Sequence, residues 1–278
     1  MTGRTAAQVT SGGVTAADRV RQVAVLVSEI ACIFGTLVGV GVIGTRVEES
    51  SGGNLSANAT LIAPAVPAFS IWSVVYAGLA AYTIWQLLPA QATDPRARAT
   101  GWLAAASMLL NAAWLLVTQV GWLWVSVAVI VALVVVLGVL VRRLTELPAR
   151  GRLDRVILDG TFGLYLGWVS VATCANIAAT LVASGVKPAS PVADVIAAVV
   201  LLVAAGVGVH LARRLGGRYA VAAAMAWGLG WIAVGRLGDA PRSAITAVAA
   251  IVAAVIVVVA AVQVRRHTDG MVLARGVR

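Results

Sequence analysis

Eight apolar runs, each about as long as a membrane is thick, constrain the fold of this chain more than any other feature. They extend over residues 22–45, 66–88, 101–118, 122–141, 160–183, 192–212, 219–236 and 243–264. A helix of about 20 apolar residues crosses a hydrocarbon core, and each unpaired backbone group costs several kcal/mol in lipid. Only 12% of the residues are charged, against about 25% in soluble domains. The chain is therefore predicted to be an all-α integral membrane protein with about eight transmembrane helices.

The net charge of +10 is distributed unevenly about these runs. Alternating membrane crossings place seventeen of the 21 Lys and Arg residues on one side, and Arg46, Lys187, Arg236 and Arg242 on the other. By the positive-inside rule, both termini are predicted to be cytoplasmic in a multi-pass protein of the cell membrane. This pattern indicates the lipid bilayer, and not a nucleic acid, as the partner.

Composition divides the chain into four parts. Residues 1–21 and 265–278 are predicted to be cytoplasmic tails, the first of them disordered. Seven of the nine tryptophans fall in a five-helix membrane core, 22–183, whereas a three-helix extension, 184–264, consists largely of Ala and Val. The loop 45–63 is rich in Gly, Ser and Asn, and it is either a lid over the helix ends or a floppy connector.

The second apolar run begins in an unusual way. Pro64 and Pro67 precede Phe69, Trp72 and Tyr76, whose spacing puts the three rings near one face of a helix. Proline is tolerated in the first turn of a helix, so a rigid start is expected. A bilayer requires only apolar residues, and the aromatic stripe therefore suggests a second role.

Two asparagines lie among apolar residues beside tryptophans. Asn111 precedes Trp114 by three residues, and Trp168, Ala172 and Asn176 recur four apart on one helical face. Buried amides are costly in hydrocarbon unless they are paired, so both should face the bundle interior. Two interpretations follow: the amides join helices by hydrogen bonds, or they orient a flat apolar ligand in an aromatic pocket.

Together these segments resemble the TspO/MBR family, tryptophan-rich sensory proteins related to the mitochondrial translocator protein. The similar segments are PAVPAFSIWSVVY (64–76), LLNAAW (109–114) and LYLGWVSVATCAN (164–176). The resemblance covers 22–183. The chain departs from the family pattern in its separated prolines, in a loop without tryptophan and in its three additional helices.

The resemblance implies a five-helix bundle that binds porphyrins or other flat hydrophobic molecules, as a sensor, regulator or carrier and not as an enzyme. A porphyrin or haem is expected as a ligand held by stacking and burial, with no obligatory cofactor. The candidate ligand-binding residues are Phe69, Trp72, Tyr76, Asn111, Trp114, Trp168, Ala172 and Asn176.

A small-solute secondary transporter is the alternative function. Such proteins often have internal repeats, broken helices and intramembrane charges, and this chain shows little of them. Glu29 is the one carboxylate well inside an apolar run, and we expect it to snorkel to water. No paired carboxylates or metal-ligand spacing stand out, so no catalytic or metal site is predicted.

The remaining expectations concern helix packing and the membrane interfaces. Glycines four apart permit close contact, either within the chain, which we expect, or between two copies in a homodimer. These pairs are Gly35 with Gly39 and Gly163 with Gly167. Residues expected at the membrane interfaces are Trp85, Trp102, Trp122, Trp124, Tyr219 and Arg236.

Overall fold

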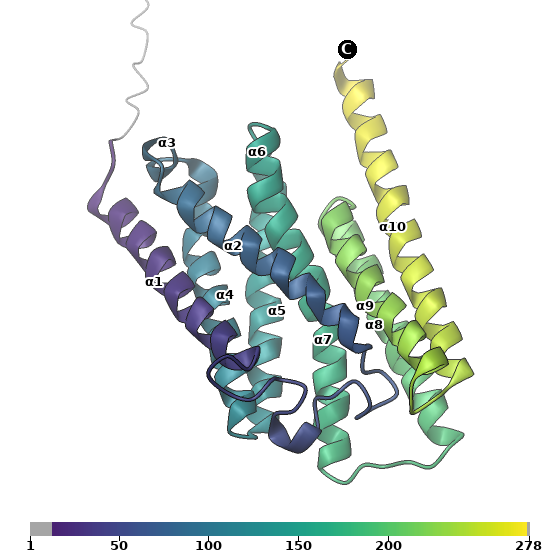
Figure 1. Cartoon of the computed structure of the whole chain (residues 1–278). Coiled ribbons are helices and arrows are strands. Elements are labelled where there is room, and N and C mark those ends of the chain that lie inside the picture. The colour runs from purple at the N-terminus through teal and green to yellow at the C-terminus, as the bar shows by residue number, and fades with distance from the viewer. Residues whose placement is uncertain (1–12, 277–278) are drawn as a thin grey trace, which may run out of the picture.

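The computed structural model describes residues 13–276, and within them it is a bundle of long helices without strands (Figure 1). Eight helices are long and apolar enough to cross a membrane, which confirms the predicted fold class. The long helices are α1 (Ala16–Gly39), α2 (Ile71–Leu87), α4 (Pro95–Gln119), α5 (Leu123–Glu146), α7 (Thr161–Ala183), α8 (Val192–Arg214), α9 (Tyr219–Gly238) and α10 (Ala244–Gly276).

The ends of the helices differ from the apolar runs because caps, and not hydropathy, set them. Helix α1 begins at Ala16, since the Thr15 side chain accepts a hydrogen bond from the Asp18 N–H while Asp18 reaches back to Thr15. It ends at Gly39, and the last residues of the first run form turns. The predicted tail 1–21 is helical from Ala16, and its residues 1–12 lie outside the described part. Helix α10 continues through the predicted tail 265–278 as far as Gly276.

Two long helices are preceded by a turn of different geometry. Helix α2 follows a 3-10 turn, η2 (Val66–Ser70), with Pro67 in its first positions as expected. Helix α7 follows the short α6 (Arg152–Asp154) and a π-helical turn, η3 (Arg155–Gly160), and these run on as one membrane-length rod. A short α3 (Pro89–Ala92) links α2 to α4.

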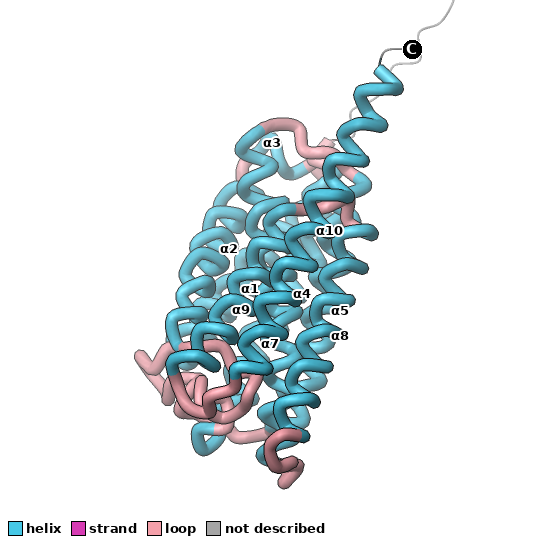
Figure 2. Tube along the Cα trace, turned by 90° about the vertical axis from the view of Figure 1, so that its right-hand side faces the viewer, coloured by secondary structure: helices cyan, strands magenta, loops and turns pink. Residues whose placement is uncertain are grey.

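The helices form a row with one diagonal member. Helix α1 packs on α4, α4 on α5, α5 on α7, α7 on α9, α9 on α10 and α10 on α8, while α2 crosses both α1 and α7 (Figures 1 and 2). The described chain begins and ends at the same end of the bundle, and the loop between α1 and α2 lies at the opposite end (Figure 1).

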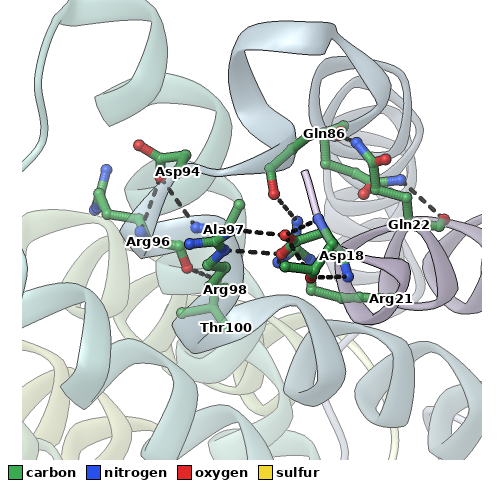
Figure 3. A network of polar contacts seen from close by, with 11 residues as sticks. Asp18, Arg21, Gln22, Gln86, Asp94, Arg96, Ala97, Arg98 and Thr100 are labelled. Carbon is green, nitrogen blue, oxygen red and sulfur yellow. Dashed lines mark hydrogen bonds and ion pairs between the residues drawn. The ribbon is translucent and has the colours of Figure 1, made fainter. Parts of the chain in front are cut away.

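Charged side chains gather at the start of α1 (Figure 3), where Asp18 and Arg21 are buried and Arg98 is partly exposed. Asp18 pairs with Arg21 at 2.9 Å and with Arg98 of α4 at 2.6 Å. The side-chain amides of Gln22 and Gln86 each donate to the other residue's carbonyl oxygen. These contacts tie α1, α2 and α4 together at one level. Removing one partner of the buried Asp18–Arg21 pair would leave an uncompensated charge.

The glycine pairs are used within the chain. A Cβ at Gly35 would lie 2.9 Å from the Ala112 Cα of α4, and one at Gly163 would lie 2.8 Å from the Ala220 Cβ of α9. At Gly167 a Cβ would collide with the Val221 carbonyl oxygen of α9. These faces are therefore occupied by α4 and α9, and a homodimer would need another surface.

Two residues that we expected to reach a membrane interface, Trp85 and Glu29, are buried instead. Trp85 is only 7% exposed, because α2 crosses the bundle and its end is covered; its ring lies 6.4 Å from that of Tyr82. Glu29 is 5% exposed and does not snorkel: α1 starts at Ala16, so this carboxyl lies several turns from the helix start and faces inward. Its Oε2 has no hydrogen-bond partner among the described residues. Trp102, Trp122 and Trp124 are exposed as expected.

We predict that Gly167→Ala destabilises the protein in detergent by about 1–3 kcal/mol, since overpacking a tight contact costs about that much. Gly230→Ala on α9 is the matched control, because nothing lies within 4 Å of its added Cβ. Thermal unfolding followed by near-UV circular dichroism measures both. Equal melting temperatures for the two variants would contradict the close α7–α9 contact.

Candidate functional site

Two neighbouring cavities lie among η2, α2, α4 and α7. The outer cleft, about 50 Å³, lies between η2, α4, α7 and the loop. The inner pocket, about 30 Å³, lies deeper and is also lined by α2 and α5. Phe69, Trp114, Trp168 and Ala172 line both cavities. The two spaces therefore share one aromatic wall, built from three separate parts of the chain.

The wall is made of interlocked rings. Trp72 stacks on Tyr76 one turn further along α2, with ring centroids 5.1 Å apart and an angle of 14° between the planes. Trp168 of α7 meets Phe69 and Trp72 edge to face, at centroid distances of 5.8 and 6.2 Å. Edge-to-face and offset-stacked pairs are the preferred arrangements of aromatic rings, and they hold these side chains in fixed orientations.

Asn111 leaves one hydrogen-bonding group free beside the inner pocket. Its Nδ2 donates to the Tyr76 hydroxyl at 3.1 Å and approaches the Cys32 sulfur at 3.5 Å. Its Oδ1 has no partner among the described residues, and neither has the indole N–H of Trp168. A buried polar group without a partner is costly, so an acceptor and a donor at this wall remain for a ligand.

Asn176 has a different role from Asn111. Its Oδ1 accepts a hydrogen bond from the Trp114 indole N–H at 2.9 Å, and its Nδ2 donates to the Ser126 hydroxyl at 3.0 Å. These bonds join α7 to α4 and to α5. Asn176 borders the outer cleft, yet both ends of its amide are already used to connect helices.

The structure gathers the eight candidate residues around one place. Seven of them line a cavity: Phe69, Trp72, Asn111, Trp114, Trp168, Ala172 and Asn176. Tyr76 lines neither cavity but supports Trp72 by stacking. Trp72 and Asn176 belong to different cavities, and Trp114 and Trp168 lie between them.

The loop between α1 and α2 forms the rest of the outer cleft. Apart from Pro64, its lining residues lie outside the sequence motifs described above. Eight of its residues line this space: Val47, Asn54, Leu55, Ser56, Ala59, Thr60, Ala63 and Pro64. The Ser51 hydroxyl donates to the Thr118 carbonyl oxygen at 2.7 Å and anchors the loop to the end of α4. The loop therefore covers the helix ends (Figures 1 and 2).

Arg236 of α9 holds this loop from the other side. Its guanidinium donates to the Thr60 and Ala57 carbonyl oxygens at 2.9 and 3.0 Å, and the side chain is only 1% exposed. The expectation that Arg236 is an interface residue is wrong, because the loop folds over α9 and supplies carbonyl oxygens to its charge.

Two tryptophans of α9 extend the same contact. The Trp227 indole N–H donates to the Ala68 carbonyl oxygen at 2.9 Å, and the Ala65 N–H donates to the Trp231 carbonyl oxygen at 3.2 Å. The sequence contained a signal for this contact: these are the only tryptophans after Trp168, they lie one turn apart, and a basic residue follows on the side that has few.

The cavity linings contain no side chain suited to holding a metal ion. Neither includes a His, Cys, Tyr, Met or carboxylate, and no group of three metal-ligating residues occurs in the part of the chain that was searched. An iron porphyrin placed here would find no axial ligand in these walls.

Comparison with known proteins gives one family. The sequence model of a family described as TSPO-like protein matches residues 22–262, from α1 into α10. The match continues past residue 183, where the resemblance of the motifs ends. The comparisons with curated proteins and with solved structures each found no match.

We predict that Arg236→Gln loosens the loop without unfolding the bundle. Hydrogen bonds to a charged group contribute about 1.5–3 kcal/mol each, so exchange of the Ala59 and Ala63 amides should quicken about tenfold or more. Hydrogen-exchange mass spectrometry measures this. Arg242→Gln is the control, because that side chain is exposed and donates only to the Gly238 carbonyl oxygen. Unchanged exchange in Arg236→Gln would show that α9 does not hold the loop.

Proposed function

The chain belongs to the TSPO-like family, and from that premise we propose that it binds a porphyrin or a similar flat hydrophobic molecule between α2, α4 and α7. The observation that carries the proposal is the aromatic wall with an unpartnered acceptor and donor beside it. With the loop in place the outer cleft encloses about 50 Å³, less than the about 300–1,000 Å³ of small-molecule sites, so a planar ligand requires the loop to move.

The shape of the wall suits a flat ligand. Phe69, Trp114 and Trp168 border both cavities, and their apolar faces would cover a planar ring system. A tetrapyrrole also carries pyrrole N–H donors and carboxylate acceptors. The free indole N–H of Trp168 matches a carboxylate on the rim of the macrocycle, and the free Oδ1 of Asn111 matches the hydroxyl of a protonated carboxyl or the outward N–H of an open-chain tetrapyrrole.

The loop acts as a lid in this proposal. Its residues close the outer cleft, and the hydrogen bonds from α9 hold it in place. Entry of a planar ligand requires these bonds to give way. Helix α9 would then set how readily the site opens. A site that opens in this way suits a sensor or a carrier better than a protein that only stores its ligand.

We further propose that both termini are cytoplasmic. The described chain starts and ends at the end of the bundle that carries the charged network, and the alternation of the helices brings most of the described arginines to that end. Because Arg236 is committed to the loop, the solvent-facing basic residues at the other end are, within the described part of the chain, Arg46, Lys187 and Arg242. The positive-inside rule then places the lid outside.

The burial of the Glu29 carboxyl favours secondary transport as the second candidate function. An ionisable residue inside the membrane is by default a functional candidate, and this one is buried with an unpartnered oxygen. In liposomes loaded with pyranine, an added porphyrin gradient would acidify the lumen for a proton-coupled carrier, and Glu29→Gln would abolish this. No acidification by the unaltered protein would leave ligand binding without coupling.

We predict that Ala172→Leu weakens ligand binding about tenfold or more, a loss of at least ~1.4 kcal/mol, because the larger side chain fills the space shared by the two cavities. Quenching of tryptophan fluorescence by protoporphyrin IX in detergent measures this. This change keeps the Asn176 hydrogen bonds, whereas Asn176→Ala would also separate α4, α5 and α7.

Ala128→Leu is the matched control, since Ala128 is exposed on α5 and borders neither cavity. Equal affinity of the two variants for protoporphyrin IX would remove the proposed site.

A further inference from the structure

A larger cleft lies at the opposite end of the bundle from the loop. It measures about 820 Å³ and lies between the end of α5, η3, the start of α9 and the last turns of α10. Its charged lining residues are Arg155, Arg218, Arg265, Asp159 and Asp269. Three guanidinium groups thus face two carboxylates, which leaves the cleft with a positive balance.

Two of the three arginines are held by ion pairs, and all three have donors to spare. Arg218 pairs with Asp159 at 3.0 Å through Nη1 and donates to the Thr145 hydroxyl at 2.9 Å through Nε. Arg265 uses only Nε, at 3.2 Å from Asp269. Arg155 makes no ion pair among the described residues. Several N–H groups therefore remain available to an anion with several oxygen atoms.

The start of α9 faces the same space. Its N-cap is Arg218, whose side chain makes no capping hydrogen bond, and the first-turn N–H groups of an α-helix have no partner within the helix. Gly217, with φ of +67°, lies so close to α10 that a Cβ would come within 2.7 Å of the Arg265 backbone nitrogen. This contact brings Arg265 next to the positive end of the α9 dipole, which adds to the attraction for an anion.

The remainder of the lining is apolar. Leu144, Pro148, Val156, Leu215 and Tyr219 contribute to it, and Tyr219 is 54% exposed. A cleft that is basic in one part and apolar in another suits an amphipathic molecule. A free inorganic anion would use only the first part.

We propose that this cleft binds an anionic phospholipid, with its phosphate at Arg155, Arg265 and the start of α9 and its acyl chains on the apolar lining. Basic recesses between membrane helices on the cytoplasmic side are suited to such headgroups. The site is separate from the aromatic cavities, and the proposal does not rest on the ligand proposed for them.

Native mass spectrometry of the full chain in detergent, titrated with phosphatidylglycerol or phosphatidylcholine, tests the proposal. We expect phosphatidylglycerol to be retained at least about fivefold more than phosphatidylcholine, which is about 1 kcal/mol. Arg155→Gln and Arg265→Gln should each reduce this preference. Arg155 has no ion pair to lose, so its variant is expected to fold.

Arg142→Gln is the control, because Arg142 is exposed, pairs only with Glu146 and does not line the cleft. Equal retention of the two lipids, or equal loss in all three variants, would overturn the proposal. A parallel titration with inorganic phosphate separates the sources: displacement of phosphatidylglycerol by millimolar phosphate would reduce the site to a simple anion site and would also overturn it.

Discussion

At Gly167 the backbone of α7 touches that of α9, where a Cβ would collide with the Val221 carbonyl oxygen. Without a hydrophobic driving force between helices in lipid, close van der Waals contact between small residues is what holds such pairs together. The rest of the structure depends on this contact. Helix α7 also packs on α5 and α2, and α9 carries α10 and, through it, α8, so the contact joins the aromatic helices to the last three.

The same contact gives α9 a part in the proposed ligand site. With α9 close to α7, its Trp227, Trp231 and Arg236 reach the segment that precedes α2. The loop is consequently held between the end of α4 and the side of α9, and it closes the outer cleft. A five-helix bundle alone would lack this second support, which makes α9 a structural element of the proposed site and not only a membrane anchor.

Much of the candidate site could be predicted from the sequence, because helical spacing decides which side chains share a face. Phe69, Trp72, Trp168 and Ala172 come together as their spacing indicates. The division of roles between the amides could not be predicted. Asn111 keeps a free oxygen while Asn176 joins three helices, and this depends on whether Tyr76, Trp114 or Ser126 lies opposite in the folded bundle. Glu29 was misjudged for a related reason: a cap, not hydropathy, sets where α1 begins.

The sequence by itself determined that this protein is a helical membrane protein with eight spans, because lipid leaves an apolar run no other way to pair its backbone groups. It also placed the aromatic and amide residues on their helices. Only the tertiary structure decided what covers them. The loop is held by Arg236 through the carbonyl oxygens of Thr60 and Ala57, and every residue in a chain offers such an oxygen. No local pattern can mark which ones an arginine from a distant helix will meet, so that choice follows from how α7 and α9 pack.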